Sequence, residues 1–517
     1  MRTKRATKNL IINFFTFIIG FIPVFWLRKV FLDSLGEEYL GLHSLFSSII
    51  GIISLAELGI ASVILYSLYQ PYAEGNREKI RAYINYYSRI YRIIGLSIFT
   101  IGLLLMPALN LFVQDGVNIE EAQLFYLLFL INTNFTYFFS MRLCILTVAE
   151  EGYKIAVAYT MTKLTTAFLQ ILILNFYADF YAFLIIQIFM TLLYFLGMNL
   201  YIRKKYPWIY SSAEKLEAKE QQLLVKNVRA FFLHKIGGVA VFSTDNLLIS
   251  YFLNLTVVGI YNSYYLIIGA MSNLVSSALS AVAPSVGNLL VEGDHEKIFL
   301  IHKRLFFFSF WIVSFLSISL FNTLKQFVLL WLGDSQVLDD LTIGLLILIF
   351  YMSLMRASVE IFKAAGGIFQ QDQLSPILEA IINLAASIVL VRYLGLPGVF
   401  LGTLISIASA VFWVKPKMVY KYIFKRKLSL YFTMYFKFFG IGLIPLFLTY
   451  IATKELQDSI TLFAFLLNCL INILVVNTFY LILFRNNGEL IYYKNLASKM
   501  LRRKEGMKLE ESNYKGN

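Results

Sequence analysis

The sequence predicts an all-α polytopic membrane protein with about fourteen transmembrane helices. Of its 517 residues, 59% are hydrophobic and only 15% are charged, whereas a soluble chain of this length would be about 25% charged. Apolar runs of about 20 residues, the length that crosses a bilayer as a helix, recur along the whole chain. Lysine and arginine gather in alternate loops, as they do in membrane proteins with a fixed orientation.

Fourteen apolar segments are expected to span the membrane. They lie near 10–30, 41–69, 93–113, 122–146, 155–177, 180–202, 230–253, 258–290, 304–331, 341–363, 375–392, 397–414, 431–452 and 460–484. The first follows a basic N-terminus but has no small-residue cleavage site, so it is expected to be a retained helix and not a signal peptide.

The charge of the loops predicts the orientation. Basic residues are frequent near the N-terminus, near 77–81, 203–205, 303–304 and 415–427, and in the C-terminal tail. The loops 114–121, 253–257 and 332–340 contain no lysine or arginine. The positive-inside rule therefore places both termini in the cytoplasm and supports an even number of spans.

The predicted spans fall into two six-helix halves. The segment 203–229 carries seven Lys or Arg and an apolar helical face, which predicts a cytoplasmic amphipathic linker along the membrane surface. The expected domains are an N-terminal lobe at 1–202, this linker, and a C-terminal lobe at 230–428. Two further helices at 429–485 and a cytoplasmic tail at 486–517 complete the chain.

An internal repeat supports this division. When the sequence is shifted by 218 residues, 41–80 aligns with 259–298 without a gap, and twelve of the 40 positions are identical. The polar loop E-G-[ND]-x-E-K-I at the end of the match is the strongest part, because apolar helices share letters by chance. Repeats of this size are common in membrane transporters and predict two pseudo-symmetric lobes.

Composition also argues against other classes. The net charge of +14 is explained by basic inner loops, so no nucleic-acid partner is expected. Cys144 and Cys469 lie far apart in apolar segments, and the four histidines have no metal-ligand spacing, so neither a disulfide nor a metal site is expected. An enzyme of polysaccharide synthesis would need a large catalytic loop or a phosphate-binding glycine loop, and neither is present.

Several motifs carry a family resemblance. The stretch L-G-E-E-Y-L-G-L at 35–42, with S-L-A-E-L-G-I at 54–60, resembles bacterial polysaccharide repeat-unit flippases, which belong to the multidrug/oligosaccharidyl-lipid/polysaccharide exporter superfamily. Three later stretches are similar to the same family: 243–250 with 258–264, 327–333, and 379–390 with 398–406. The motifs follow one another in order along nearly the whole chain.

The resemblance implies two lobes around a central cavity. It also implies a substrate, an undecaprenyl-pyrophosphate-linked oligosaccharide of capsule or O-antigen assembly, which is flipped to the outer leaflet. Membrane lipids and the polysaccharide polymerase machinery are the implied partners. A multidrug or metabolite exporter and a peptidoglycan lipid-precursor flippase of the same fold stay open as alternatives. No cofactor is expected, and coupling to H⁺ or Na⁺ stays open.

Ionisable residues within spans are functional candidates, because each costs roughly 2.5–3.5 kcal/mol on insertion. Lys163 shares a polar stripe with Tyr159 and Gln170 and could face the diphosphate, or it could snorkel or pair with an acid that locks two helices together. Arg356 could bind phosphate oxygens bidentately, although Glu360 four residues later could neutralise it instead. Arg28 could contact substrate or anchor the first span at the outer interface.

Two further sets complete the predicted site. Asn262 and Asn273 lie on a stripe of small and polar residues, which could bind sugar hydroxyls or pack helices closely. Glu57, Asp245 and Glu360 are candidates for ion coupling. The alternative for these acids is pairing with lysine or arginine inside the bundle.

Overall fold

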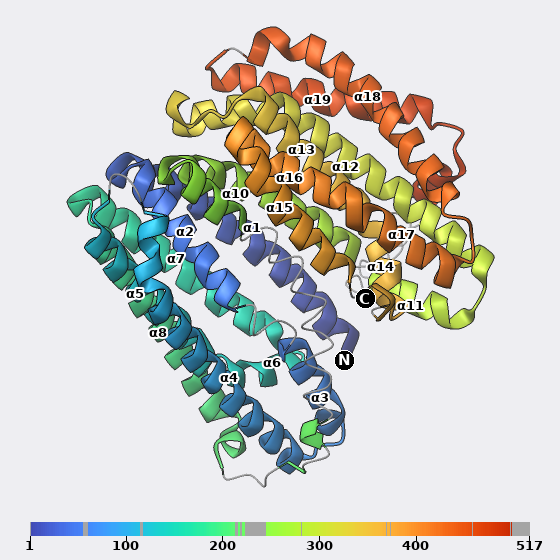
Figure 1. Ribbon diagram of the computed structural model, residues 1–517. Helices are drawn as coiled ribbons and strands as arrows, with labels where there is room; N and C mark the ends of the chain where they lie inside the picture. Colours follow the sequence, from blue (N-terminus) through green and yellow to red (C-terminus); the bar gives the residue numbers. More distant parts are fainter. Residues whose placement is uncertain are drawn as a thin grey trace, which may run out of the picture. The chain divides into compact units, whose positions relative to one another are not determined.

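The computed structural model of the chain describes residues 2–54, 60–113, 117–211, 216–217, 220–222, 244–280, 282–368, 370–372, 374–457, 459–496 and 498. These residues are almost entirely helical, and no strand occurs among them (Figure 1). The all-α prediction is therefore confirmed. Glu57 and about half of the predicted linker at 203–229 lie outside the described residues.

The chain groups into two compact units, which are described separately. The first holds Met1–Tyr265 and Gln373–Ser406, and the second holds Leu266–Asp372 and Ile407–Asn517. The first unit contains α1 (Arg2–Leu35), α2 (Glu37–Ile53), α3 (Ile60–Ala73), α4 (Arg77–Leu105), α5 (Ile119–Phe139), α6 (Cys144–Val148), α7 (Gly152–Tyr177), α8 (Phe180–Lys205), the start of α10 (Leu255–Ser280), α15 (Ser375–Leu394) and α16 (Leu396–Ser406).

The second unit contains the remaining helices. They are the rest of α10, α11 (Ala283–Glu292), α12 (His295–Leu332), α13 (Asp340–Met355), α14 (Ala357–Ala365), α17 (Phe412–Val419), α18 (Ser429–Gln457) and α19 (Leu462–Leu483). Figure 1 shows α12, α18 and α19 side by side. A helical segment at 488–496 follows α19.

The predicted spans correspond to helices of the right length. Among the described residues, ten helices are long and apolar enough to cross a membrane, and the bent pair Ile119–Phe139 with Met141–Val148 makes an eleventh. These eleven match all predicted spans except 10–30, 41–69 and 230–253, which include residues or side chains that are not described. Large apolar side chains such as Phe176, Phe447 and Phe463 are more than half exposed, as expected for helices whose solvent is lipid.

Side-chain caps define where many helices begin. Asn76, Asn118 and Asp179 accept hydrogen bonds from backbone N–H groups in the first turns of α4, α5 and α8. Asp294 and Asp339 do the same for α12 and α13. Such caps satisfy N–H groups that have no partner within the helix, and each stabilises a helix by about 1 kcal/mol.

The repeated loop adopts the same conformation twice. Gly75 and Gly293 both have positive φ, at 71° and 76°, a conformation that glycine adopts without a steric cost. One residue later Asn76 accepts from the Lys79 N–H at 3.0 Å, and Asp294 accepts from the Lys297 N–H at 3.1 Å. The sequence repeat at 74–80 and 292–298 is thus also a repeat of local structure.

The two copies of the repeat also meet each other within the first unit. A Cβ atom at Gly41 of α2 would lie 1.9 Å from the Leu255 carbonyl oxygen, and a Cβ at Gly259 of α10 would lie 2.7 Å from the Glu37 oxygen. Glu37 and Leu255 are themselves 218 positions apart. The contact is therefore reciprocal, as in an isologous interface, and glycine at both positions lets the two backbones approach.

A ladder of buried amides attaches the last two helices to α12. Asn322 of α12 donates to Thr449 Oγ1 of α18 and to Asn472 Oδ1 of α19, both at 2.8 Å. Asn468 of α19 donates to Gln326 Oε1 of α12 at 3.1 Å. Interhelical hydrogen bonds of this kind contribute about 0.6 kcal/mol each in membranes, and together they fix α18 and α19 in register on α12.

Candidate functional site

Arg28 of α1 lies against the first turns of α10. Its Nη2 atom donates to the Gly259 carbonyl at 2.9 Å and to Ser263 Oγ at 3.0 Å, and Nε also donates to Ser263. Gly259 is the residue of the close α2–α10 contact. The guanidinium thus ties α1 to the point where the two copies of the repeat meet, while no acid is among these partners.

Asn262 belongs to a chain of side chains beside this contact. It donates to Asn246 Oδ1 at 2.9 Å, and Asn246 donates to Ser48 Oγ of α2 at 2.8 Å. Asn246 and Ser48 are both buried. The three residues link α10, the helical segment 244–252 and α2, so the structure gives Asn262 a helix-packing contact of the kind that was one of its two predicted roles.

Asp245 is the buried acid next to this chain. Its side chain is 2% exposed, and among the described residues its Oδ1 atom has no hydrogen-bond partner. A buried carboxylate oxygen without a partner carries a full desolvation cost. Asp245, Asn262 and Arg28 are therefore brought into one polar region of the first unit.

The residues of the predicted polar stripe on α7 differ in whether they contact α8. Gln170 is buried and donates to the Phe183 carbonyl at 3.2 Å, and the ring of Tyr159 packs edge-on against Tyr194 at 5.8 Å. Lys163 lies between them on the same helix and is exposed. Among the described residues, the ion pairs of α7 and α8 involve Lys154 and Lys205 instead. Lys163 is thus the cation of this stripe for which the described residues provide no acid partner.

Arg356 is paired with Glu360, as its structural alternative predicted. Arg356 Nε lies 3.2 Å from Glu360 Oε1, and Lys415 Nζ of α17 lies 2.6 Å from the same oxygen. Two cations thus share one carboxylate, which leaves a net positive charge. Arg356 Nη1 is buried and has no partner among the described residues.

Lys415 was missed as a site residue. The sequence interpretation placed it in an inner loop at 415–427, but the helical backbone continues through α17 to Phe424. A π-helical turn at Ile407–Val411 precedes α17, and Pro416 lies within it. Such turns widen a helix and often occur at functional sites. The proline was the signal in the sequence, because it removes a backbone donor and disturbs the regular helical turn.

Asn273 is the last predicted residue with a described side chain. It is exposed on the part of α10 that belongs to the second unit. Its predicted neighbour on the stripe, Asn262, lies eleven residues earlier in the first unit. Among the described residues, no three His, Cys, Asp or Glu side chains gather as they would around a metal ion.

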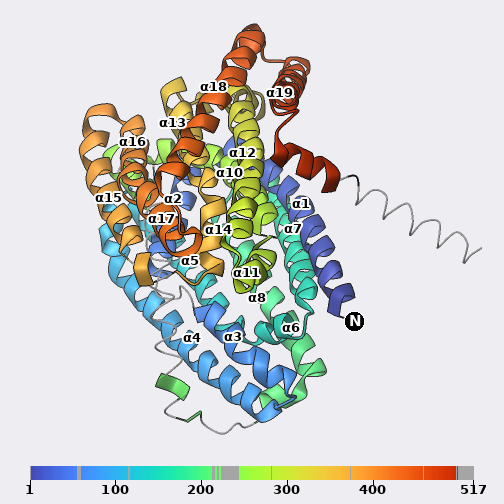
Figure 2. The same cartoon turned by 90° about the vertical axis from the view of Figure 1, so that its right-hand side faces the viewer.

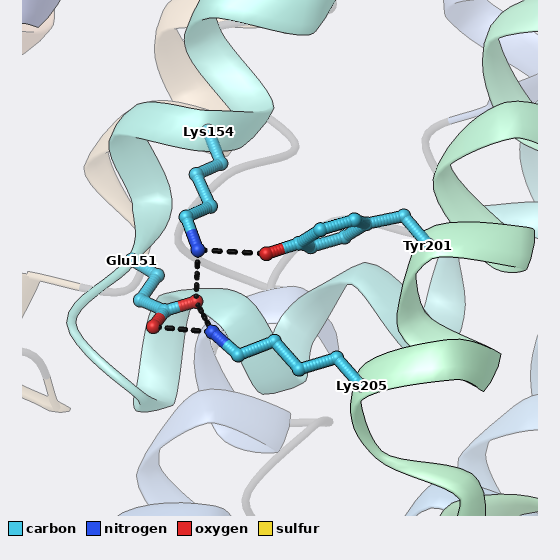
Figure 3. A network of polar contacts seen from close by, with 4 residues as sticks. All are labelled: Glu151, Lys154, Tyr201 and Lys205. Carbon is cyan, nitrogen blue, oxygen red and sulfur yellow. Dashed lines mark hydrogen bonds and ion pairs between the residues drawn. The ribbon is translucent and has the colours of Figure 1, made fainter.

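A charged network closes the turn between α6 and α7 (Figure 3). Glu151 accepts from Lys205 of α8 and from Lys154 of α7, and Lys154 also donates to Tyr201 Oη at 2.7 Å. Burial acts to raise the pKa of the Glu151 carboxyl, but the hydrogen bonds from Lys205 and Lys154 outweigh it and lower that pKa below its ordinary value. The turn therefore holds an ionised carboxylate between two lysines.

Comparison with known proteins gives the fold. The chain matches the lipid II flippase MurJ in an inward closed conformation with a TM-score of 0.68 over 93% of this chain and 99% of that chain, at 14% identity. The fold is that of MurJ. It is also similar to an inward-facing multidrug resistance MATE family transporter of the MOP superfamily, with a TM-score of 0.60 over 77% of this chain and 94% of that one, at 15% identity.

A eukaryotic MATE transporter matches with a TM-score of 0.53 over 79% of this chain and 94% of that chain, at 14% identity. No protein-family model and no curated protein matches the sequence. The all-α transporter fold implied by the resemblance to the exporter superfamily is confirmed at the level of fold.

Proposed function

We propose that this protein flips undecaprenyl-pyrophosphate-linked oligosaccharide repeat units from the cytoplasmic to the outer leaflet by alternating access, for polysaccharide assembly. The proposal rests on one combination: a fold like that of MurJ and MATE transporters with cations inside its apolar helices. Arg356 and Lys415 share one carboxylate, Glu360, and among the described residues neither Lys163 nor Arg28 is in an ion pair.

An anionic substrate explains this excess of positive charge. A cation within a span is costly, and an apolar residue would pack there at lower cost. A diphosphate offers oxygens to a guanidinium in the bidentate geometry that lysine cannot match. The Arg356 Nη1 atom, which has no hydrogen-bond partner in the described part of the chain, is therefore the preferred donor to the diphosphate, while Glu360, itself bound by Lys415, holds the guanidinium in place.

The remaining parts of the proposal follow the sequence. The protein acts in a bacterial inner membrane with both termini in the cytoplasm and works beside the polysaccharide polymerase machinery. H⁺ or Na⁺ coupling falls to the acids Asp245, Glu360 and Glu57. Among these, Asp245 is favoured because its buried Oδ1 atom has no hydrogen-bond partner within the described ranges.

The test is transport by purified protein in vesicles, with a fluorescent undecaprenyl-pyrophosphate-linked oligosaccharide as substrate. We expect Arg356→Ala to abolish its movement between leaflets and Arg356→Lys to retain part of it. Lys325→Ala is the matched control, because Lys325 pairs with Asp340 at the far end of α12. If the double variant Arg356→Ala with Glu360→Ala regained transport, Arg356 would serve only to neutralise Glu360.

A second candidate is a peptidoglycan lipid-precursor flippase. It is favoured by the match to MurJ, described as a lipid II flippase, which extends over nearly all of both chains. The same vesicles separate the two candidates when they contain a fluorescent lipid II in place of the repeat unit. Movement of lipid II without movement of the oligosaccharide carrier would replace the first proposal with the second.

A further inference from the structure

An aromatic groove lies on the second unit where α19 ends. It holds about 320 Å³ and is bordered by Phe308, Trp311 and Ile312 of α12, Leu481 of α19, and Tyr493 and Lys494 of the segment 488–496. Its volume falls in the range of small-molecule sites, roughly 300–1,000 Å³. Figure 2 shows the segment 488–496 in dark red, directly before the grey trace.

Hydrogen bonds and a ring contact hold the aromatic residues of the groove in place. Trp311 Nε1 donates to Asn477 Oδ1 of α19 at 2.9 Å, which fixes the indole. Tyr493 stacks on Phe308 with ring centroids 5.4 Å apart, and its hydroxyl donates to the Arg304 carbonyl at 3.1 Å. The segment 488–496 is thus held against α12 by a ring contact and a hydrogen bond, and the groove remains beside them.

Two cations lie on the elements that border this groove, Lys494 on the segment 488–496 and Arg304 on α12. Lys494 lines the groove and is exposed. The Arg304 guanidinium lies 3.8 Å from the centre of the Tyr492 ring, over its face. The ion pairs found among the described residues of this unit use other cations. Glu489, the acid of the same segment, lies five positions before Lys494 and is in none of the ion pairs found among the described residues of this unit.

The groove therefore combines an apolar lining with two basic side chains on the elements that border it. It occurs where the apolar helix α19 gives way to polar and basic residues, which is the depth of the interface between acyl chains and headgroups. Tyrosine and tryptophan are enriched at this depth, and basic residues there attract anionic lipids. A zwitterionic lipid would fill the apolar part equally well but would gain nothing from the two cations.

We propose that this groove binds one anionic glycerophospholipid, with an acyl chain along Trp311 and Leu481 and the phosphate near Lys494 and Arg304. The bound lipid would fill the space between α12, α19 and the segment 488–496 and so hold the end of the chain against the bundle. This site is separate from the cations of the proposed transport site and does not depend on the transported substrate.

Trp311 provides the test. Replacement of the other four tryptophans by phenylalanine leaves Trp311 as the single indole of the full chain. The protein is reconstituted in mixed phosphatidylcholine and phosphatidylglycerol vesicles in which only one of the two lipids carries brominated acyl chains, since bromine quenches an indole that it touches. We expect phosphatidylglycerol to compete for the groove about thirtyfold better than phosphatidylcholine, since each of the two nearby basic residues is expected to contribute about fivefold.

Variants of the two basic residues test whether they bind the lipid headgroup. Lys494→Gln and Arg304→Gln should each lower the preference for phosphatidylglycerol, and the double variant should abolish it. Arg304→Lys should retain it, because the charge remains. Lys325→Gln is the matched control at the other end of α12 and should leave the preference unchanged. An unchanged Trp311 emission maximum in each variant shows that the groove remains folded.

Three outcomes would overturn the proposal. Equal quenching by both brominated lipids would mean that the groove takes annular lipid without regard to charge. Absence of quenching by either would mean that no acyl chain reaches Trp311. A preference for phosphatidylglycerol that persists in the double variant would place the headgroup on other residues.

Discussion

The two copies of the repeated loop, 74–80 and 292–298, share a backbone but not their ion pairs. Each has a glycine with positive φ followed by a capping residue, Asn76 or Asp294. In the first copy Lys79 pairs with Glu220, outside the repeat, whereas in the second Lys297 pairs with Glu292 within the loop. The two copies thus share the turn and the cap, and only the pairing of their common surface charges differs, because such pairs contribute little to stability.

A similar contrast occurs at two later turns. The turn between the predicted fourth and fifth spans holds Glu151 with two lysines, and the turn between the tenth and eleventh holds Asp372 with Lys363. Lys363 and Asp372 are almost fully buried, whereas Glu151 is partly exposed. The acid–lysine pair is therefore expected to contribute more to stability in the second turn, because a buried charge without its partner is costly.

The largest effect is expected in experiments that report on which side of the membrane each loop lies. If the two loops are equivalent, reporter fusions after residue 75 and after residue 293 should both report the cytoplasmic side, as should fusions after 215 and 505. Fusions after 26 and 118 should report outside. Alkaline phosphatase and fluorescent-protein fusions measure this. Opposite locations for 75 and 293 would break the equivalence of the two copies.

The reciprocal helix contact should be the next most sensitive feature. Gly41→Val is expected to abolish folded protein, because the new Cβ would lie 1.9 Å from a backbone oxygen that cannot move away by a rotamer change. Gly259→Ala, at 2.7 Å, should cost about 1–3 kcal/mol. Gly269→Ala is the control, since nothing lies within 4 Å of its Cβ position. The yield of folded protein and its melting temperature in detergent measure these effects. Equal behaviour of all three variants would contradict the close contact between α2 and α10.

Removal of the acid should destabilise the protein by different amounts at the two acid–lysine turns. Asp372→Asn should cost about 3–5 kcal/mol, because it leaves Lys363 buried without its partner. Glu151→Gln should cost about 1.5–3 kcal/mol, the value of hydrogen bonds to a charged group. Chemical denaturation of the purified protein at neutral pH compares them. A larger loss for Glu151→Gln would reverse the comparison.

The Glu151 contribution should also depend on pH. Since the folded state lowers the pKa of Glu151, its stabilising effect is complete above the ordinary glutamate value of about 4.3. It is lost as pH falls through the lower folded value. The stability difference between the native protein and Glu151→Gln should therefore shrink below about pH 4, while both lysines stay charged. A difference that is constant down to pH 3 would contradict this assignment.

The two caps should have similar and smaller effects. Asn76→Ala and Asp294→Ala are each expected to cost about 1 kcal/mol, because each leaves a first-turn N–H without its acceptor. Asn76→Asp should retain most of the stability, since the residue of the other copy makes the same bond. Melting temperatures of the three variants measure this, and a loss at only one of the two positions would show that the loops are not equivalent.

The smallest effect is expected for the loop ion pair of the second copy. Glu292 and Lys297 are each about half exposed, so Glu292→Gln should change stability by about 0.5 kcal/mol or less. That difference should vanish at about 1 M salt, where the screening length is about 3 Å. A large effect that persists in high salt would show that the two loops differ in more than surface charge.

The sequence by itself determined those features that depend on neighbours along the chain. Apolar runs gave the spans, the glycine and capping residue of each repeated loop gave its turn, and the spacing of Arg356 and Glu360 gave their pairing as one of two alternatives. These are local properties, because helix period and capping link residues that are at most four apart.

Only the tertiary structure decided which helix faces meet. It brought Lys415 to Glu360, Arg28 to Gly259 and Asn322 to Asn472, and it placed Gly41 and Gly259 in one helix crossing. None of these contacts has a periodic signal in the sequence. In a chain whose helices are apolar on nearly every side, the choice of neighbour depends on close packing and on a few buried polar groups, and both exist only once the helices are assembled.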